Sequence, residues 1–497
     1  MKKHSQIFIF FFIILLTGNQ KLVSQELSAV IKDSLTEKPI PFASIYSSKG
    51  TGIMANEEGF FRLHLEAKAN DTIYFSCMGY ETLSQVASQF SDSIVFLTPK
   101  SIALNSVIVT NKDLTAKEII KAVKRDIPDK YELGLTNKKL FFRSSGFQEF
   151  KTLKIKVKKS SIEELNQEFW DSTLQKMPRK SDWHVEILGN LYGDHTEENQ
   201  KLELQKALEL EDKETTALFK NITSAFDTIL KQNVKPDSYF KLRTGIISAD
   251  LESDNLSSLE KDTLTTEEKK VKEKESFLKW RKEILTDLSV SIFEKESLNL
   301  GVIKKPSKYD FKRINFTYIG DIPVYILSFT PKGKADYTGK IYVDANEMAL
   351  IRIEYKNIQD IRDISLLGMS FKHYLKEVVL QFKKMNSGKY TLQFFELSDG
   401  YESGVDRAFT IVEKNKVVKG RNKQNELKMD LNVQTIQTQK YQGVIFETET
   451  ISQEEFDGFK ENPSILPVNL TQYDPTFWQG HTIIEPNQAI KNFKVDK

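Results

Sequence analysis

The sequence predicts an α+β protein that is mostly β, with a β-sandwich first, a helical charged middle and a C-terminal antiparallel β domain. Three observations lead to this class. Short alternating apolar runs separated by turn residues fill residues 28–80, which is typical of a small sandwich. Charged stretches with helical periodicity follow between residues 197 and 288. Alternating segments joined by Gly, Asn and Asp turns then fill residues 309–397.

The first 24 residues have the pattern of a signal peptide. Lys2 and Lys3 precede an unbroken apolar run at residues 7–16. This run is shorter than the about 20 residues that a membrane-spanning helix needs, so a cleaved leader is favoured over a retained anchor. We therefore expect an exported protein with no transmembrane segment in the mature chain.

Charge and cysteine content narrow the class of partner. The chain has 497 residues and a formal net charge of +2. The leader holds three lysines and no acidic residue, which leaves 68 basic against 69 acidic residues in the remainder. Such a balance provides no basic field, so we expect no nucleic-acid partner. Cys77 is the single cysteine, which excludes an internal disulfide and favours a small buried apolar role.

Turn residues divide residues 25–99 into short strands. Pro39 and Pro41 suit a strand entrance or an edge. A tight turn at residues 56–59 precedes an apolar strand, and Pro99 closes the last strand. Several of these residues agree in type and order with a known pattern: Asp33, Thr36, Pro39, Ile40, Pro41, Ala43, Ile45, Gly52, Asn56, Glu58, Gly59, Phe60, Leu63, Ile73, Phe75, Ser76, Gly79 and Tyr80.

On these residues the segment resembles the carboxypeptidase-like regulatory domain of Bacteroidetes envelope proteins. The resemblance implies a transthyretin-like β-sandwich over residues 25–99 that is itself not catalytic. Ser28 and Asn56 depart mildly from the pattern, which more often has glycine and aspartate there. A tail at residues 473–486, with the pattern Tyr-Asp-Pro-x-Phe-Trp-x-Gly…Glu-Pro, is similar to the ends of proteins in the same group.

Residues 100–135 read as a linker strand followed by a helix. Residues 104–110 are similar to the stretch that precedes the barrel of outer-membrane receptors, but the chain beyond them is too short and too helical for such a barrel. Thr115 and Glu118 form a capping box. An apolar stripe follows, and Pro128 is expected to end the helix.

Residues 136–300 read as a helix-rich charged region. A basic run at residues 151–159 is the exception, because its alternation predicts a strand with Leu153, Ile155 and Val157 inward and lysines outward. Leucines between residues 197 and 230 suggest a helix. A second helix begins at a capping box of Thr265 and Glu268. Its charged first half is expected to be solvated, and four residues of its second half to dock on the body: Phe277, Leu278, Trp280 and Ile284.

The pattern of residues 301–460 predicts successive antiparallel strands, with one face exposed to solvent and one face buried. Their order is similar to the half-barrel of periplasmic lipoprotein-carrier proteins, and a carrier of this kind predicts an apolar pocket between the curved sheet and a helix. Residues 461–497 form an aromatic tail. Phe477 and Trp478 are expected to pin this tail to the β domain; a surface patch for sugar stacking is the alternative.

No familiar catalytic signature is present in the sequence. It has no nucleophile elbow, phosphate-binding loop or calcium loop. His195 and Glu198 have the spacing of a zinc carboxypeptidase, with His373 as a nominal third ligand. A paired-carboxylate cleft needs no fixed spacing and stays open as a second hydrolase alternative. We assign no catalytic, cofactor-binding or metal-binding residue.

The sequence therefore favours an exported, non-catalytic envelope protein with a binding or scaffolding role at the outer membrane or in the periplasm. A carrier of an apolar ligand, such as a lipid or lipoprotein held in a half-barrel cavity, is the first alternative. A hydrolase with a paired-carboxylate or zinc site is the second. The expected partner is another envelope protein or an apolar ligand, and no cofactor is expected.

Overall fold

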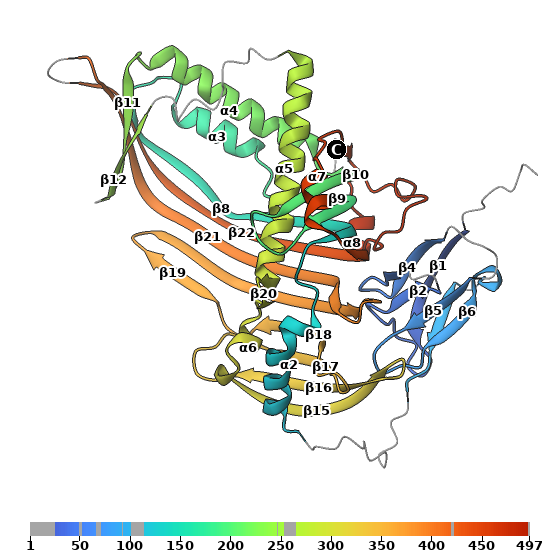
Figure 1. The fold of residues 1–497 in the computed structure, drawn as a ribbon. Helices are drawn as coiled ribbons and strands as arrows, with labels where there is room; N and C mark the ends of the chain where they lie inside the picture. The colour runs from blue at the N-terminus through green and yellow to red at the C-terminus, as the bar shows by residue number, and fades with distance from the viewer. Residues whose placement is uncertain are drawn as a thin grey trace, which may run out of the picture. The chain divides into compact units, whose positions relative to one another are not determined.

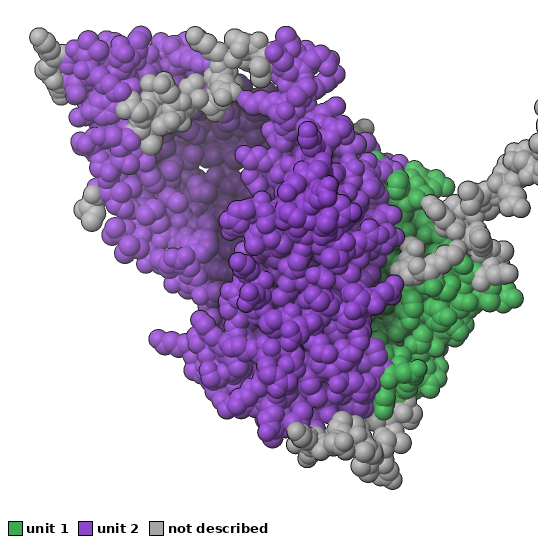
Figure 2. Space-filling view, viewed as in Figure 1, with its two compact units in different colours: residues 1–106, 318–321, 475–487 green, residues 107–317, 322–474, 488–497 purple. Residues whose placement is uncertain are grey.

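The computed structural model describes residues 25–48, 52–65, 71–91, 93–100, 114–245, 247–252, 265–418 and 422–495. The chain divides into two compact units, which Figure 2 colours separately. Unit 1 consists of residues 1–106, 318–321 and 475–487, and unit 2 of residues 107–317, 322–474 and 488–497. Unit 1 therefore combines the N-terminal part of the chain with two later segments. The stretch at residues 104–110 lies outside the described residues.

Unit 1 is a sandwich of two small sheets. One has the order β4-β1-β7 and the other β3-β2-β5-β6. The strands are β1 Gln25–Asp33, β2 Ser44–Ser47, β3 Gly52–Met54, β4 Phe60–Leu65, β5 Thr72–Ser76, β6 Leu83–Val86 and β7 Ile94–Leu97, with a 3₁₀ turn η1 at Ala87–Gln89. Alternate residues of β4 are buried, and Phe61 and Phe75 meet in a core that both sheets share. The predicted sandwich is confirmed.

Two distant segments complete unit 1. The Asn56 side-chain amide donates to the Pro486 carbonyl over 3.2 Å. The Gly79 N–H donates to the Tyr318 carbonyl over 3.2 Å, and Lys100 Nζ donates to the Gly320 carbonyl over 2.9 Å. The sandwich is thus not built from its own contiguous sequence alone.

Unit 2 is organised by one open sheet of 14 strands (Figure 1). Its main path runs β15-β16-β17-β18-β20-β21-β22-β8-β9-β10-β23, with β19 on β20, β11 on β21 and β12 on β11. The strands are β8 Thr136–Ser160, β9 Lys180–Gly193, β10 Gln200–Leu210, β11 Ser238–Thr244, β12 Ile247–Glu252, β15 Tyr309–Ile319, β16 Ile322–Pro331, β17 Tyr337–Asp344, β18 Leu350–Asn357, β19 Arg362–Leu366, β20 Met369–Lys384, β21 Tyr390–Asn415, β22 Lys423–Thr450 and β23 Val468–Leu470.

Helices cover parts of this sheet. They are α2 Ala116–Lys130, α3 Gln167–Lys176, α4 Lys213–Asn233, α5 Thr266–Ile292, α6 Gly301–Lys304, α7 Gln453–Gly458 and α8 Gln488–Lys491, with a 3₁₀ turn η3 at Pro306–Lys308 and a short hairpin of β13 Phe293–Glu294 and β14 Ser297–Leu298. None of the helices in the described ranges is both long and apolar enough to cross a membrane.

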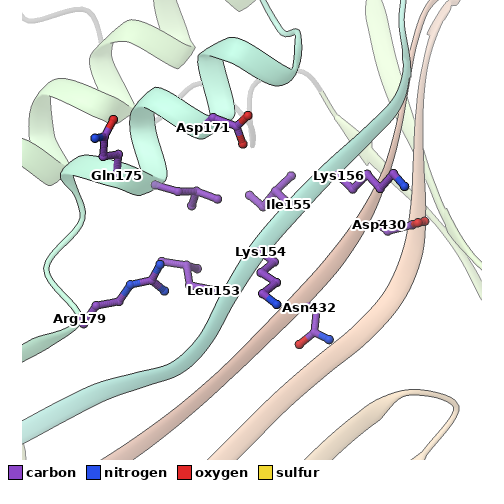
Figure 3. Close-up of a pocket in the computed structure, with 10 residues that line it drawn as sticks. Leu153, Lys154, Ile155, Lys156, Asp171, Gln175, Arg179, Asp430 and Asn432 are labelled. Atoms are coloured by element: carbon purple, nitrogen blue, oxygen red, sulfur yellow. The ribbon is translucent and has the colours of Figure 1, made fainter.

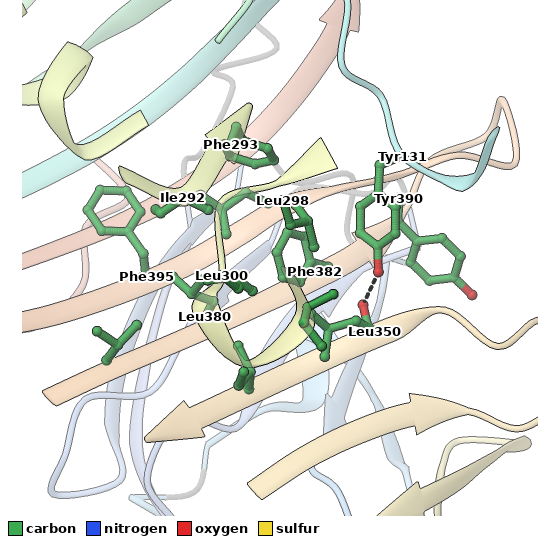
Figure 4. Close-up of a cluster of buried hydrophobic side chains, with 14 of the residues drawn as sticks. Tyr131, Ile292, Phe293, Leu298, Leu300, Leu350, Leu380, Phe382, Tyr390 and Phe395 are labelled. Atoms are coloured by element: carbon green, nitrogen blue, oxygen red, sulfur yellow. Dashed lines mark hydrogen bonds between the residues drawn. The ribbon is translucent and has the colours of Figure 1, made fainter. Parts of the chain in front are cut away.

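The largest core lies between the sheet and the helices α2 and α5. Ile292 of α5 packs in one buried cluster with Leu380 and Phe395 of the sheet (Figure 4). Leu285 of α5 belongs to the same cluster. Tyr131, at the end of α2, is 1% exposed, and its hydroxyl donates to the Leu350 carbonyl over 2.7 Å. Buried side chains therefore pack between this part of the sheet and the helices α2 and α5.

A second, smaller core lies further along the long strands. Leu427 and Met429 of β22 are buried beside Ile162 and Leu165, in the segment that leads into α3. Phe226 of α4 packs against this cluster. The helices α3 and α4 therefore cover a separate part of the sheet from α5.

The structure corrects the expected division of the chain. Much of residues 136–300 is strand, since β8, β9 and β10 belong to the main sheet. Leu202 and Leu204 lie on β10 with a polar residue between them, a period of two that belongs to a strand and not to a helix. The expected boundary at residue 300 also falls inside unit 2, because β8 pairs with β22 over most of its length.

The tail at residues 461–497 does not pack as expected. Trp478 is 2% exposed, as an anchor should be, but it belongs with residues 475–487 to unit 1 and not to the β domain. Residues 488–497 belong to unit 2. A pattern of aromatic residues indicates burial without indicating the surface that covers them.

The observed helix starts agree with the predicted ones better than the domain boundaries do. Both capping boxes, at Thr115 and at Thr265, are present. Leu278 is buried as predicted, with Phe277 and Ile284 packed against the core, but Trp280 is 63% exposed. Pro128 lies in the last turn of α2, where the helix continues for two further residues instead of ending.

Candidate binding surface on the inner face of the sheet

The helix-covered side of the unit 2 sheet, here called the inner face, can be followed along a single strand. Phe395 and Leu397 of β21 lie in the core under α5, and Phe409 and Ile411 pack in the core under α3 and α4. All four are odd-numbered, and alternate residues of a strand point to the same face. The positions between them, from residue 399 to 407, lie between the two helix layers.

An apolar row crosses five neighbouring strands in this interval. The pairing register places Leu366 opposite Met369, Met369 opposite Val405, Val405 opposite Val433, and Val433 opposite Leu153. Residues that face each other in neighbouring strands point to the same side of the sheet. The row of Leu366, Met369, Val405, Val433 and Leu153 therefore lies on the inner face.

Burial increases from one end of the row to the other. Leu366 is 63% exposed and Met369 is 38% exposed, whereas Leu153 is 7% exposed. A parallel row begins with Ile364 and Phe371, which are 43% and 37% exposed. Contiguous exposed apolar side chains of this kind mark binding surfaces in soluble proteins.

The apolar stretch is bounded on the side toward α5. One step along the strands, Arg362 pairs with His373, and His373 with Tyr401. His373 Nε2 lies 2.9 Å from Asp399 Oδ1, and Lys376 Nζ lies 3.1 Å from the same oxygen. This polar cluster separates the exposed apolar rows from the filled core.

A cavity lies at the buried end of the row. Strand β9 pairs with β8 only as far as Glu149, so the remainder of β8 is open on that side and α3 lies beside it. The cavity has a volume of about 560 Å³, and its lining residues are Leu153, Lys154, Ile155, Lys156, Asp171, Leu174, Gln175, Arg179, Asp430 and Asn432 (Figure 3). This volume is within the range of small-molecule sites.

The surface of unit 2 is visibly hollowed in this region. Figure 2 shows a recess where Figure 1 draws the long strands β8, β21 and β22, between α3–α4 and α5. In Figure 3, Ile155 lies on the strand side of the opening and Asp171 on the helix side. The cavity and the apolar row share Leu153.

Positive charge predominates at the cavity. Lys154, Lys156 and Arg179 are exposed and form no ion pair with any residue in the described ranges. Of the two lining carboxylates, Asp430 already pairs with Lys158, 3.0 Å away. Asp171 accepts a hydrogen bond of 2.8 Å from the Gln167 amide.

A further cation flanks the row itself. Arg407 lies two residues beyond Val405 on β21 and so on the same face. Its Nη2 donates to the Thr244 carbonyl over 2.9 Å. Its Nη1 is buried without a hydrogen-bond partner among the described residues.

The exposed end of the row is a strained hairpin. Leu367 and Gly368 form the two-residue turn between β19 and β20, with φ values of +52° and +76°. Leucine in the left-handed region costs about 1–2 kcal/mol, and this side chain is also 47% exposed. A residue that is unfavourable in both respects points to a binding role.

The structure does not bring together the three residues of the nominal zinc site. His195 is buried, stacked on Phe293 with ring centres 3.7 Å apart, and its Nδ1 lies 3.0 Å from Ser289 Oγ. Burial lowers the pKa of His195 well below its usual value. Glu198 is exposed, and His373 is held by Asp399. Within the described ranges, no group of three or more His, Cys, Asp or Glu side chains is placed to hold a metal ion.

The predicted basic strand is present, but the sequence did not indicate that it contributes a residue to an apolar row. Leu153 is buried, Ile155 and Val157 are half-buried and the neighbouring lysines are exposed, as alternation predicted. Leu153 joins the row only through the register in which β8 pairs with β22, β22 with β21 and β21 with β20. No local signal reports that register, because the five residues come from three distant parts of the chain.

Comparison with known proteins identifies one part of the chain. The model of the family described as CarboxypepD_reg-like domain matches residues 27–109. No curated protein matches the chain.

Solved structures show only distant likeness. One is MucB, with 7% identity and a TM-score of 0.16 over 64% of this chain and 92% of that one. A second is the MucA/MucB complex of Pseudomonas aeruginosa, with 7% identity and a TM-score of 0.15 over 65% and 93%. A third is a protein of unknown function from Bacteroides fragilis, with 11% identity and a TM-score of 0.13 over 82% and 98%. At these TM-scores the likenesses support no inference about function.

The family match and the two-sheet sandwich agree on the same segment and on the predicted resemblance. Residues 27–109 of this chain are a CarboxypepD_reg-like domain.

Proposed function

We propose that the protein is exported and acts without catalysis, by binding a ligand or partner at the outer membrane or in the periplasm. The proposal further places binding of an apolar ligand on the row of Leu366, Met369, Val405, Val433 and Leu153. The observation that carries it is the register of these five residues across five strands, with exposure falling from 63% at Leu366 to 7% at Leu153.

The apolar-carrier alternative gains from this row, although not in its original form. The core under α5 packs between the sheet and that helix, so we place the apolar ligand on the row instead of beneath α5. From its exposed end the row leads to the cavity beside α3. A hydrolase is less well supported, because the nominal zinc residues are apart and both cavity carboxylates are held by other side chains.

Titration with the uncharged dye 1-N-phenylnaphthylamine tests the proposal. Its fluorescence rises when it enters an apolar site, so the protein should give saturable enhancement. Val405→Asp places a charge in the middle of the row and should abolish most of this enhancement. Ser370→Asp is the matched control, since Ser370 pairs with Ser365 on the opposite, polar face of the same hairpin.

Near-UV circular dichroism should show that both variants keep the native fold. Absence of saturable dye binding by the unmodified protein contradicts the proposal. Equal binding by the Val405→Asp and Ser370→Asp variants would place the apolar site elsewhere.

A further inference from the structure

The apolar row and the cations at its buried end together specify the chemistry of one ligand. We infer that the inner face binds an anionic amphiphile, with its apolar chain along the row and its negatively charged head in the cavity beside α3. This inference rests on the proposed function and deepens it by naming the ligand class.

The row has the dimensions of a single lipid chain. Five strands separated by about 4.8 Å give it a length of roughly 19 Å. One leaflet of a membrane, half of a hydrocarbon core of about 30 Å, is roughly 15 Å thick. An extended acyl chain of membrane length therefore fits between Leu366 and Leu153 without leaving the row.

The cavity selects the head group by charge. Lys154, Lys156 and Arg179 have no ionic partners in the described part of the chain, and Lys158 already neutralises Asp430. The cavity spans the open edge of β8, where Leu153 and Ile155 lie on the inner face and Lys154 and Lys156 on the opposite face. An anion at this edge would meet three cations without ionic partners, and Asp171 already accepts a hydrogen bond from Gln167. Arg407, with its buried unpartnered Nη1, adds positive charge beside the row.

The gradient of exposure gives the direction of the ligand. The cations lie at the end where Leu153 is 7% exposed, and the chain would lead outward to Leu366, which is 63% exposed. A carboxylate and a phosphate ester offer the same anionic chemistry, which a fatty acid and a phospholipid-like molecule share. The strained Leu367 turn would then extend the apolar contact beyond the last strand.

An alternative role for the three cations, protection of the open strand edge, can be tested in the same experiment. Lysines on an open strand edge protect it against pairing with other chains. In that case the three cations would have no effect on ligand affinity, and an anionic and a neutral amphiphile of equal chain length would bind equally well.

Isothermal titration calorimetry of the protein with three twelve-carbon amphiphiles separates these cases, with the anions below their micelle concentrations and the alcohol below its solubility limit. The probes are dodecanoate, dodecyl phosphate and uncharged dodecanol. We expect the two anions to bind about tenfold more tightly than the alcohol, as three exposed ionic contacts of about 0.5 kcal/mol each would give. Raising the salt concentration to 0.5 M should reduce this difference.

The variant Lys154→Gln/Lys156→Gln/Arg179→Gln should reduce the affinity for both anions to that for dodecanol and leave dodecanol binding unchanged. Lys176→Gln, an exposed lysine of α3 that does not line the cavity, is the control and should behave as the unmodified protein.

Each failure has a distinct meaning. Equal affinity for anions and alcohol in the unmodified protein, or unchanged anion binding in the triple variant, overturns the inference about the head group and leaves the proposed function standing. Failure of all three amphiphiles, together with failure of the uncharged dye, overturns both. Preference for one anion over the other, lost in the triple variant, supports the inference and identifies the head.

Discussion

Arg62 and Glu485 form an ion pair in unit 1, with Arg62 Nε 2.8 Å from Glu485 Oε1. The Glu485 side chain is 1% exposed and the Arg62 side chain 21%. The next residue, Pro486, accepts a hydrogen bond from Asn56, 430 positions earlier in the chain. A segment that follows nearly all of unit 2 in sequence therefore completes the N-terminal sandwich.

Replacing Arg62 with Gln should destabilise unit 1 by about 3 kcal/mol, because the buried Glu485 carboxylate would lose this ion pair. Hydrogen exchange of the β1 and β4 amides measures this unit by itself, and these amides should exchange about a hundredfold faster. Exchange in β20 and β21 of unit 2 should change little.

Arg179→Gln is the control for removal of an arginine, since Arg179 is exposed and forms no ion pair within the described ranges. If β1 and β4 exchange at the same rate in the Arg62→Gln variant as in the unmodified protein, the segment at residues 475–487 contributes no stability through this pair.

This ion pair illustrates what the sequence could and could not predict. Local patterns identified the sandwich strands, both capping boxes and the alternation of the basic strand, because each depends on residues a few positions apart. The tail pattern predicted that Trp478 is buried, but nothing local to it indicated Arg62 or Asn56 as neighbours. The same limit applies to β8, whose pairing with β22 joins residues nearly three hundred positions apart and creates the apolar row.

Stability should fall on acidification through His184. Burial, with a further effect from nearby Arg143, lowers the pKa of His184 to about 4, below its usual value of 6.5. Between these two values the unfolded chain takes up a proton that the folded protein does not, so the free energy of unfolding decreases as pH falls from 6.5 toward 4. The full loss is about 3 kcal/mol.

Urea unfolding at pH 7.0, 5.5 and 4.5 measures this dependence. In the His184→Gln variant, which keeps a polar group near Ser145, the decrease should be smaller, and the part that remains would include His195. A variant with the same pH dependence as the unmodified protein would show that His184 titrates equally in the folded and unfolded states.

Replacing Leu367 in the turn of the β19–β20 hairpin should stabilise the protein, although it removes an exposed apolar side chain. Asn is better suited than Leu to a φ of +52°, so Leu367→Asn should raise the free energy of unfolding by about 1 kcal/mol. Gly368→Ala should lower it, because a Cβ there would lie 2.2 Å from the Asp406 carbonyl oxygen and φ is +76°. Urea unfolding at pH 7 compares the two, and a destabilising Leu367→Asn would mean that Leu367 contributes more by packing than it costs by strain.

Close packing of glycine against aromatic rings limits substitution in the long strands. A Cβ at Gly443 of β22 would lie 2.2 Å from the Phe395 ring, and one at Gly146 of β8 would lie 2.3 Å from the Trp183 ring. Phe395 belongs to the core under α5, where the ring has little room to move. Gly443→Ala should therefore cost about 2 kcal/mol, a typical penalty for overpacking.

Gly301, at the start of α6, is the matched position for this test, because a Cβ there would meet nothing within 4 Å. Gly301→Ala should leave the free energy of unfolding unchanged or raise it by about 0.5 kcal/mol through the lower entropy of the unfolded chain. Urea unfolding followed by near-UV circular dichroism gives both values. A Gly443→Ala variant as stable as Gly301→Ala would show that the Phe395 ring moves aside without cost and that the core between sheet and α5 is loosely packed.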